Sequence, residues 1–152
     1  MISSISHTDS SLAFPILSMI LILFLLGSLV IWLMRDEQLA KVISLAVTFT
    51  GLILSIAVVW GYDPSNNAFQ YLERLPWIRS LNIDYIVGID GISVLFLPLT
   101  NILFIGIILS TWTSIRKMPK LFYTLMLLLQ FATIGIFISL NTILFFLFWE
   151  LS

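Results

Sequence analysis

Long apolar runs alternate with short polar stretches along this chain of 152 residues. Four complete runs cover 12–34, 42–60, 92–113 and 121–140, and a fifth begins at 142 and reaches the last residue, 152. Each complete run is close to the ~20 residues that carry a helix across a bilayer. The runs lack the strict alternation of barrel strands, so they predict helices. We therefore expect one membrane region over 1–152, of the all-α integral membrane class, with four complete transmembrane helices and the first half of a fifth.

The connection over 61–91 is the longest between the runs. Asp63 and Pro64 near its start suit the first two positions of a type I turn. Two stretches, 68–72 and 82–87, hold several β-forming residues and predict a hairpin lying on the membrane surface. Asp90 directly precedes the next run, where a carboxylate can accept hydrogen bonds from the free N–H groups of a helix start. We expect it to cap that helix.

The composition agrees with a membrane protein and narrows the possible chemistry. Hydrophobic residues make up 60% of the sequence and charged residues 10%, against about 45–50% and about 25% in soluble chains. The net charge of -1 offers no basic field for nucleic acid. The absence of cysteine from the sequence excludes disulfides, cysteine-ligated metal centres and thiol catalysis. The single histidine, His7, lies in a polar N-terminal arm and is expected to be exposed.

The basic residues predict how the chain is oriented. The connections after the first and third runs lie on the same face of the membrane and hold five of the seven basic residues: Arg35, Lys41, Arg116, Lys117 and Lys120. The opposite face holds only Arg74 and Arg79. Lys and Arg collect on the cytoplasmic side of membrane proteins. The five-cation face is therefore expected in the cytoplasm or matrix, with the N-terminus outside. Trp32 and Trp112, near the inner ends of their runs, agree with this orientation.

One acidic residue, Glu150, lies within an apolar run. At ~1.5 Å per residue it is ~12 Å from Thr142, near the middle of the bilayer. An ionised side chain at that depth costs at least ~2.5–3.5 kcal/mol, and such residues mark proton relays. Glu150 is therefore the candidate catalytic residue, taking up and releasing a proton. No Lys, Arg or His lies within the apolar runs, so a cationic partner must come from elsewhere.

Two interpretations of this end of the chain stay open. Glu150 could lie near a natural terminus and flex toward water. The run 142–152 is only about half of a membrane crossing, so such a terminus would leave backbone carbonyls unpaired in hydrocarbon. We expect instead an incomplete helix, continued in another polypeptide or cut at this point. Trp149 either shields Glu150 or simply packs against its neighbours.

A few uncharged polar residues also lie within the runs. Pro98, Thr100 and Asn101 follow one another closely in the third complete run, and Gln130 and Thr133 lie in the fourth. Interhelical hydrogen bonds are the usual role of such residues in membranes. We expect them to mark protein-facing surfaces, with a proton wire as the alternative.

Two segments together resemble a known family. They are 87–93, Val-Gly-Ile-Asp-Gly-Ile-Ser, and 144–151, Leu-Phe-Phe-Leu-Phe-Trp-Glu-Leu. In this combination and at this separation they resemble the antiporter-like subunit 4 of proton-pumping NADH:quinone oxidoreductase, respiratory complex I. Asp63-Pro64-Ser65 with Phe69-Gln70 is similar to its mitochondrial and alphaproteobacterial branch.

The resemblance implies the start of an antiporter-like helical bundle built on two inverted repeats. It implies that Glu150 is a proton-path residue that pairs with a Lys two helices later, which this sequence does not contain. It also implies that NADH, FMN, iron–sulfur clusters and quinone bind other subunits, leaving no cofactor or metal here. The implied partners are other membrane-arm subunits, a second polypeptide carrying the remainder, and the lipid bilayer, without nucleic acid.

The resemblance implies that the chain is one subunit of an enzyme that couples NADH oxidation and quinone reduction to proton transfer. No independent activity is expected of this chain alone. The implied location is the mitochondrial inner membrane, multi-pass with the N-terminus in the intermembrane space, or else a bacterial cytoplasmic membrane. Two alternatives stay open. One is a structural scaffold subunit of a respiratory complex with no proton path of its own, and the other is a small independent transporter using one membrane Glu.

Overall fold

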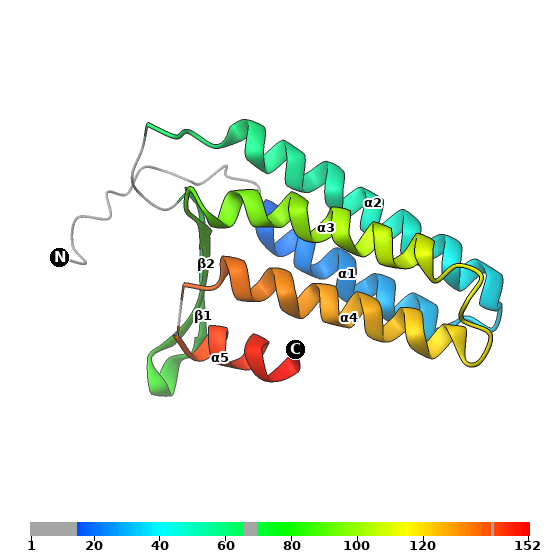
Figure 1. Ribbon diagram of the computed structural model, residues 1–152. Helices are drawn as coiled ribbons and strands as arrows, with labels where there is room; N and C mark the ends of the chain where they lie inside the picture. The colour runs from blue at the N-terminus through cyan, green and yellow to red at the C-terminus, as the bar shows by residue number, and fades with distance from the viewer. Residues whose placement is uncertain (1–14, 66–69, 141) are drawn as a thin grey trace.

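The computed structural model describes residues 15–65, 70–140 and 142–152. Figure 1 shows helices α1 to α4 side by side as a bundle, with a pair of strands across one end and α5 returning along α4. The elements follow in the order α1 (Ile16–Leu33), α2 (Glu37–Gly61), β1 (Gln70–Ile78), η2 (Arg79–Leu81), β2 (Ile83–Ile89), α3 (Ser93–Ser110), α4 (Pro119–Ile138) and α5 (Thr142–Leu151).

Helices α1 to α4 are long and apolar enough to cross a membrane, which confirms the prediction of four complete membrane-spanning helices. The first expected span begins at residue 12, and residues 12–14 lie outside the described part of the chain, as does His7. Helices α3 and α4 end earlier than the expected 113 and 140. The fifth helix, α5, is a short apolar helix within 142–152.

Helix α2 begins before the expected residue 42, so the predicted start was wrong. The Asp36 carboxylate accepts hydrogen bonds from the backbone N–H of Gln38 over 2.9 Å and of Leu39 over 3.4 Å. This cap starts the helix at Glu37, in polar sequence that the apolar run does not include. An apolar run therefore gives the length of the hydrocarbon crossing rather than the length of the helix.

The long connection forms an antiparallel hairpin of β1 and β2. The first strand runs from Gln70 to Ile78, well beyond the expected 68–72, while residues 68 and 69 lie outside the described part. Its register is irregular between Pro76 and Ile78, which suits a residue that cannot donate to a strand ladder. At the tip, Asn82 has a φ of 52°, a left-handed conformation that asparagine tolerates.

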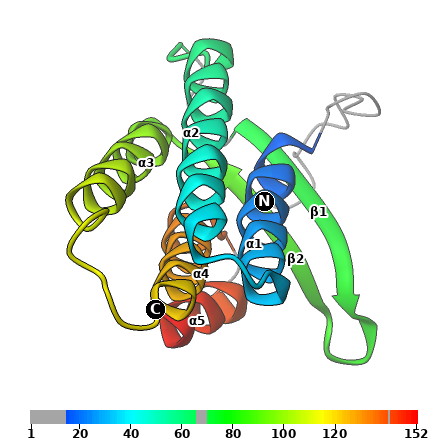
Figure 2. The ribbon, with the colours of Figure 1, turned by 90° about the vertical axis from the view of Figure 1, so that its right-hand side faces the viewer.

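The helices pack closely where small residues line their contacts. Helix α1 lies against α2 and α4, and α2 also packs against α3 and α4, an arrangement seen along the bundle in Figure 2. A Cβ atom on Gly27 of α1 would lie 3.0 Å from the Val47 methyls of α2 and 3.3 Å from Leu127 of α4. Small residues at such crossings let membrane helices approach one another.

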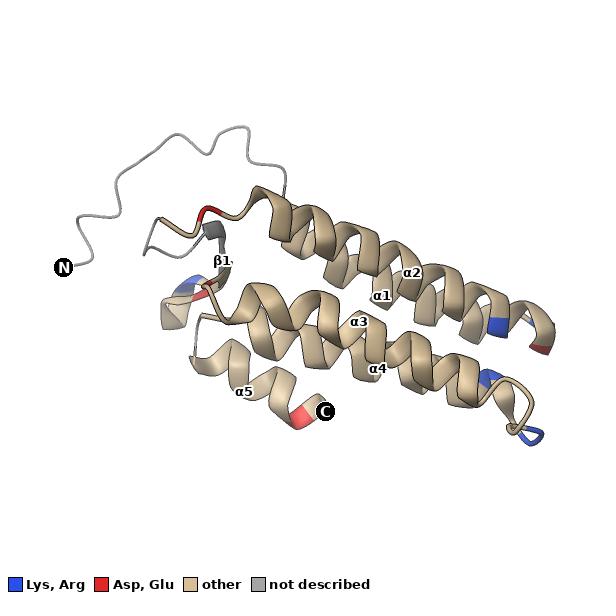
Figure 3. Ribbon diagram, turned by 45° about the horizontal axis from the view of Figure 1, so that its top comes forward, with Lys and Arg blue, Asp and Glu red and all other residues tan. Residues whose placement is uncertain are grey.

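The polar ends of the bundle differ in charge. Figure 3 shows most of the described Lys and Arg gathered at the end opposite the hairpin. There Lys41 Nζ donates a hydrogen bond to the Trp112 carbonyl over 2.8 Å. The Lys120 ammonium lies 5.6 Å from the centre of the Trp32 ring. The cations expected on one face therefore do share one end, where two tryptophans accompany them.

Candidate functional site

Glu150 lies near the end of α5, on the side of the helix turned away from the bundle. Leu144 and Phe148 are the buried residues of α5, and Phe148 packs against Gly135 and Phe131 of α4. At 3.6 residues per turn, Glu150 is rotated by about 200° from Phe148. Its side chain is exposed, and Figure 3 shows the described Lys and Arg at the two ends of the bundle, away from it. Any cation facing this carboxylate must therefore come from outside the described residues.

The position of α5 is set by one aromatic side chain lodged against a glycine. The Phe148 ring occupies the space beside Gly135 of α4, where a Cβ atom would come within 2.4 Å of it. Phe131, one turn before Gly135, meets the same ring edge-on with centroids 5.4 Å apart. Trp149 instead stacks on Phe145 of its own helix at 6.3 Å.

The turn between α4 and α5 is tied to the hairpin. The backbone N–H of Leu140 donates to the Ile86 carbonyl over 3.0 Å, and Ser139 forms an isolated antiparallel bridge with Val87. Strand β2 thus has backbone partners on both of its edges. Together with the ring of Phe148, these bonds fix where α5 begins and along which face of α4 it runs.

A second polar feature is a chain of hydrogen bonds in the middle of the bundle. Thr48 of α2 donates to Gln130 Oε1 of α4 over 3.2 Å, and Gln130 Nε2 donates to Asn101 Oδ1 of α3 over 2.7 Å. Asn101 Nδ2 donates in turn to Ser55 Oγ of α2 over 2.9 Å. All four side chains are fully buried. We call this set, Thr48, Ser55, Asn101 and Gln130, the polar clamp.

The polar clamp fits because Gly51 leaves room for it. A Cβ at Gly51 would lie 2.8 Å from Asn101 Oδ1 and 2.4 Å from the Phe24 ring. The buried face of α2 is formed by small and polar residues at helical spacing: Ala40, Ser44, Thr48, Gly51, Ser55 and Val58. Sequence analysis missed Thr48 and Ser55, although this spacing was a usable signal.

The chemistry of the polar clamp suits the joining of helices rather than proton conduction. Its two central members are amides, and amide side chains neither gain nor lose a proton in the way carboxylates do. The expectation that Asn101 and Gln130 face protein is therefore confirmed. Thr133 differs, since it is half-buried and its hydroxyl donates to the Leu129 carbonyl of its own helix. Among the described residues no hydrogen bond joins Thr133 to another helix, so its expected interhelical bond stays a prediction.

Asp90 caps α3, as predicted. Its carboxylate accepts hydrogen bonds from the backbone N–H of Ser93 over 2.7 Å and of Ile92 over 3.1 Å. The Ser93 N–H lowers the pKa of this carboxyl below its ordinary value of 3.8. At the other end of the same connection, Asp63 accepts from the Ser65 hydroxyl and backbone N–H, and these bonds lower its pKa too. Both carboxylates therefore accept hydrogen bonds from residues two or three positions later in the chain.

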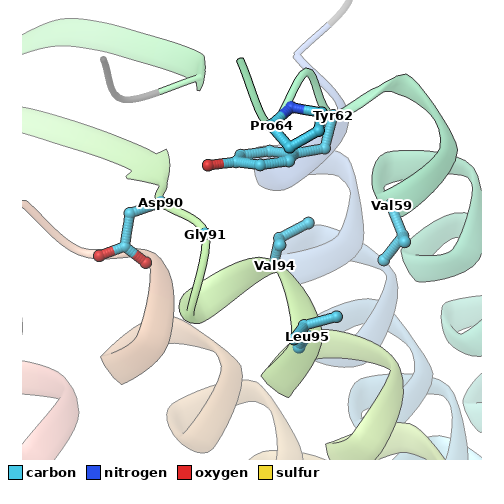
Figure 4. A pocket seen from close by; sticks show the side chains of 7 residues that line it. All are labelled: Val59, Tyr62, Pro64, Asp90, Gly91, Val94 and Leu95. Carbon is cyan, nitrogen blue, oxygen red and sulfur yellow. The ribbon is translucent and has the colours of Figure 1, made fainter. Parts of the chain in front are cut away.

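A surface pocket of about 460 Å³ lies beside Asp90, between the end of α2 and the start of α3. Figure 4 shows Pro64 against the Tyr62 ring on one side of it, and the Asp90 carboxylate pointing away from the apolar side chains of Val94 and Leu95. That carboxylate already accepts hydrogen bonds from the helix start, which leaves the Tyr62 hydroxyl as the other polar side-chain group of the lining. Within the described residues no cluster of three or more His, Cys, Asp and Glu could hold a metal ion.

Comparison with known proteins gives relatives over 91% of the chain. It is 33% identical to F(420)H(2) dehydrogenase subunit M of Methanosarcina mazei and 31% identical to NADH-quinone oxidoreductase subunit M of Rickettsia prowazekii. It is 38% identical to an NAD(P)H-quinone oxidoreductase chain 4 of Microcystis aeruginosa. The chain spans only 28%, 29% and 26% of the lengths of these relatives, respectively.

A solved structure shares the fold. The membrane-bound sulfane sulfur reductase, an archaeal respiratory membrane complex, contains a chain that matches with a TM-score of 0.68 at 18% identity. The match covers 87% of this chain and 20% of that one. No profile of a known protein family matches the chain. The relatives confirm the resemblance to subunit M and chain 4 proteins, and the fold is shared with part of a chain of this archaeal respiratory membrane complex.

Proposed function

We propose that this chain, a homologue of part of the subunit M and chain 4 proteins of NADH-quinone oxidoreductases, helps to move protons in the membrane arm of such an enzyme. The observation that carries the proposal is Glu150, an acidic side chain on an otherwise apolar helix that packs along a membrane-spanning one. Charges in such positions are costly and mark proton relays and ion pathways. The proposed partners are the other membrane-arm subunits.

The proposed mechanism uses the outward-facing position of Glu150. A cation opposite a carboxylate favours its charged form, and withdrawal of that cation favours uptake of a proton. The cation would come from outside the described residues and approach the face of α5 that is turned away from α4. Movement of this cation would then load and unload the carboxylate. The packing of Phe148 against Gly135 would hold the Glu150 carboxylate in a fixed place while the cation moves.

The proposal assigns the redox chemistry to other subunits. Iron–sulfur clusters are held by cysteine thiolates, and this sequence has none. NADH, FMN and quinone would likewise bind elsewhere, and their reactions would reach this chain only as a displacement of the group facing Glu150. The chain therefore needs no cofactor for its proposed role.

The proposed orientation follows from the charged ends of the bundle. The end with five basic residues would lie in the cytoplasm or matrix, and the hairpin would lie on the outer surface with the N-terminus on the same side. The membrane would be the mitochondrial inner membrane or a bacterial cytoplasmic membrane. Both agree with a multi-pass protein whose relatives include bacterial subunits.

The test is Glu150→Gln in the assembled enzyme, because glutamine keeps the shape of the side chain and removes its charge and its titration. We expect NADH-driven acidification of inverted membrane vesicles to be abolished while the assembled enzyme is present in normal amount. Glu37→Gln is the matched control, since Glu37 is exposed at the basic end of the bundle. Proton pumping equal to wild type in the Glu150→Gln enzyme would contradict the proposal.

A structural scaffold is the second candidate function. The observation that favours it is that Glu150 is exposed, with the described cations at the ends of the bundle, while the polar clamp joins α2, α3 and α4 internally. In that case Glu150→Gln would leave both pumping and assembly unchanged, whereas loss of the clamp would reduce assembly. The same pair of measurements therefore separates the two candidates.

A further inference from the structure

A groove of about 420 Å³ runs between α1 and α4 at the basic end of the bundle. Its walls are Leu25, Leu29 and Trp32 from α1 and Leu121, Leu125 and Leu128 from α4. Most of these side chains are exposed although they are large and apolar. The groove is therefore shaped between two membrane-spanning helices and opens on the outside of the bundle, where hydrocarbon is available.

The two polar side chains in the groove are already satisfied. Ser28 donates its hydroxyl hydrogen bond to the Leu25 carbonyl over 2.7 Å. Thr124 does the same to the Lys120 carbonyl over 2.8 Å. Neither hydroxyl needs a partner from an occupant, so the groove offers apolar contact along its length. This lining suits a hydrocarbon chain and gives a polar segment nothing to bind.

The charge lies at one end of the groove. Lys120 is partly buried, and its ammonium sits over the Trp32 ring. Tryptophan prefers the level of the lipid headgroups. Arg35, Arg116 and Lys117 are exposed at the same end of the bundle, where the only described acids are Asp36 and Glu37. An occupant with an apolar tail and a negatively charged head would match both parts of the groove.

We propose that this groove binds an anionic phospholipid, with one acyl chain between α1 and α4 and the phosphate beside Lys120. Basic pockets between transmembrane helices on the cytoplasmic or matrix side are known to bind such headgroups. The cation–π contact with Trp32 holds the ammonium at headgroup depth before the lipid arrives. The proposal stands independently of any role of Glu150 in proton movement.

The test uses the assembled protein in vesicles with photoreactive lipids. Phosphatidylglycerol and phosphatidylcholine carrying the same photoreactive acyl chain are cross-linked in separate samples, and labelling of residues 119–128 is measured by peptide mass spectrometry. Competition with unlabelled phosphatidylglycerol gives the relative affinity of the site. We expect Lys120→Gln to weaken phosphatidylglycerol binding about fivefold, because one basic residue near a membrane surface contributes about that much.

Three variants keep the result interpretable. Lys117→Gln removes an exposed cation from the same end without touching Trp32, so it should weaken phosphatidylglycerol binding less than Lys120→Gln does. Lys120→Arg should retain it. Leu125→Trp fills the groove and keeps every charge, so it should abolish labelling by both lipids. Equal labelling by the two lipids in the wild-type protein, equal affinity in Lys120→Gln, or undiminished labelling in Leu125→Trp would each overturn the proposal. A helix of another subunit found in the groove would do the same.

Discussion

Asn101 and Gln130 place two amide side chains where the rest of the bundle is largely apolar. Burying an amide that has no hydrogen-bond partner costs about 1–3 kcal/mol of stability in mutational series. Each amide here uses both its oxygen and its nitrogen, and the bonds reach three helices. The polar clamp therefore favours one relative placement of α2, α3 and α4, since sliding any helix by a turn would break it.

This view predicts coupling between Asn101 and Gln130. Asn101→Leu and Gln130→Leu should each lower the free energy of unfolding by about 1–2 kcal/mol, because each removes the bond between them and leaves one buried polar atom of the other amide, Gln130 Nε2 or Asn101 Oδ1, without its partner. The double variant should cost less than the sum of the two, by about 1 kcal/mol. Unfolding in detergent–bicelle mixtures measures this, with Thr133→Val as the control, because the Thr133 hydroxyl donates to a carbonyl of its own helix. Additive losses would show that the two amides do not act together.

The residues of the candidate sites were predictable only in part. Glu150, Asn101 and Gln130 are visible because they are strongly polar within apolar runs. Thr48, Ser55 and Gly51 are small, and small residues are common in membrane helices, so only their spacing along α2 marks them. The half-buried position of Thr133 could not be read from the sequence, because α4 is apolar on nearly every side and its rotation is fixed by packing against α1, α2 and α3.

Helix α5 shows how one element is fixed by two others. Its buried face is narrow, with Leu144 and Phe148 as its buried residues, so its docking depends on the space beside Gly135. A helix start was predictable where a capping residue directly precedes an apolar run, as Asp90 does. It was less predictable at Glu37, where the helix extends into polar sequence. The extent of β1 was missed because Pro76 is a poor strand former that this hairpin accommodates at a register irregularity.

Gly135→Ala should loosen α5. The added methyl would meet the Phe148 ring at 2.4 Å, so the ring and the helix that carries it must shift, at a cost of about 1–3 kcal/mol. Hydrogen–deuterium exchange should therefore become faster at the amides of α5. Gly106→Ala is the matched control, because beyond its chain neighbours and the backbone of its own helix nothing lies within 4 Å of the added Cβ. Unchanged exchange in α5 would refute the idea that this glycine seats the helix.

On the scale of the whole molecule, most described charged residues lie at the two ends of the bundle, and its sides are largely apolar all the way round. The membrane-spanning helices expose large apolar side chains on their outer surfaces, and the described charged residues other than Glu150 lie at the ends of the helices or in the connections. Length and hydropathy suffice to predict this arrangement. The order of the helices around the bundle was not predictable, because it depends on close contacts such as those at Gly27 and Gly51.

The orientation of the bundle can be tested directly because the sequence has no cysteine. Single cysteines at Ser114, in the basic connection, and at Ser80, at the hairpin tip, are both exposed. We expect a membrane-impermeant maleimide to label Ser114→Cys only from the cytoplasmic or matrix side and Ser80→Cys only from the opposite side, because basic connections stay inside. The reverse pattern would show that the bundle is inverted, and detergent-permeabilised samples control for reactivity.

The contacts of α5 also bear on how the protein is made. The elements that it contacts, α4 and β2, precede it along the chain. Both have therefore been synthesised before α5 leaves the ribosome. The described part of α5 buries only Leu144 and Phe148, so its docking depends on its contacts with α4 and β2. Glu150 therefore reaches its place only after α4 and β2 have been made, and defects in the hairpin would appear during biogenesis as a failure of α5 to dock.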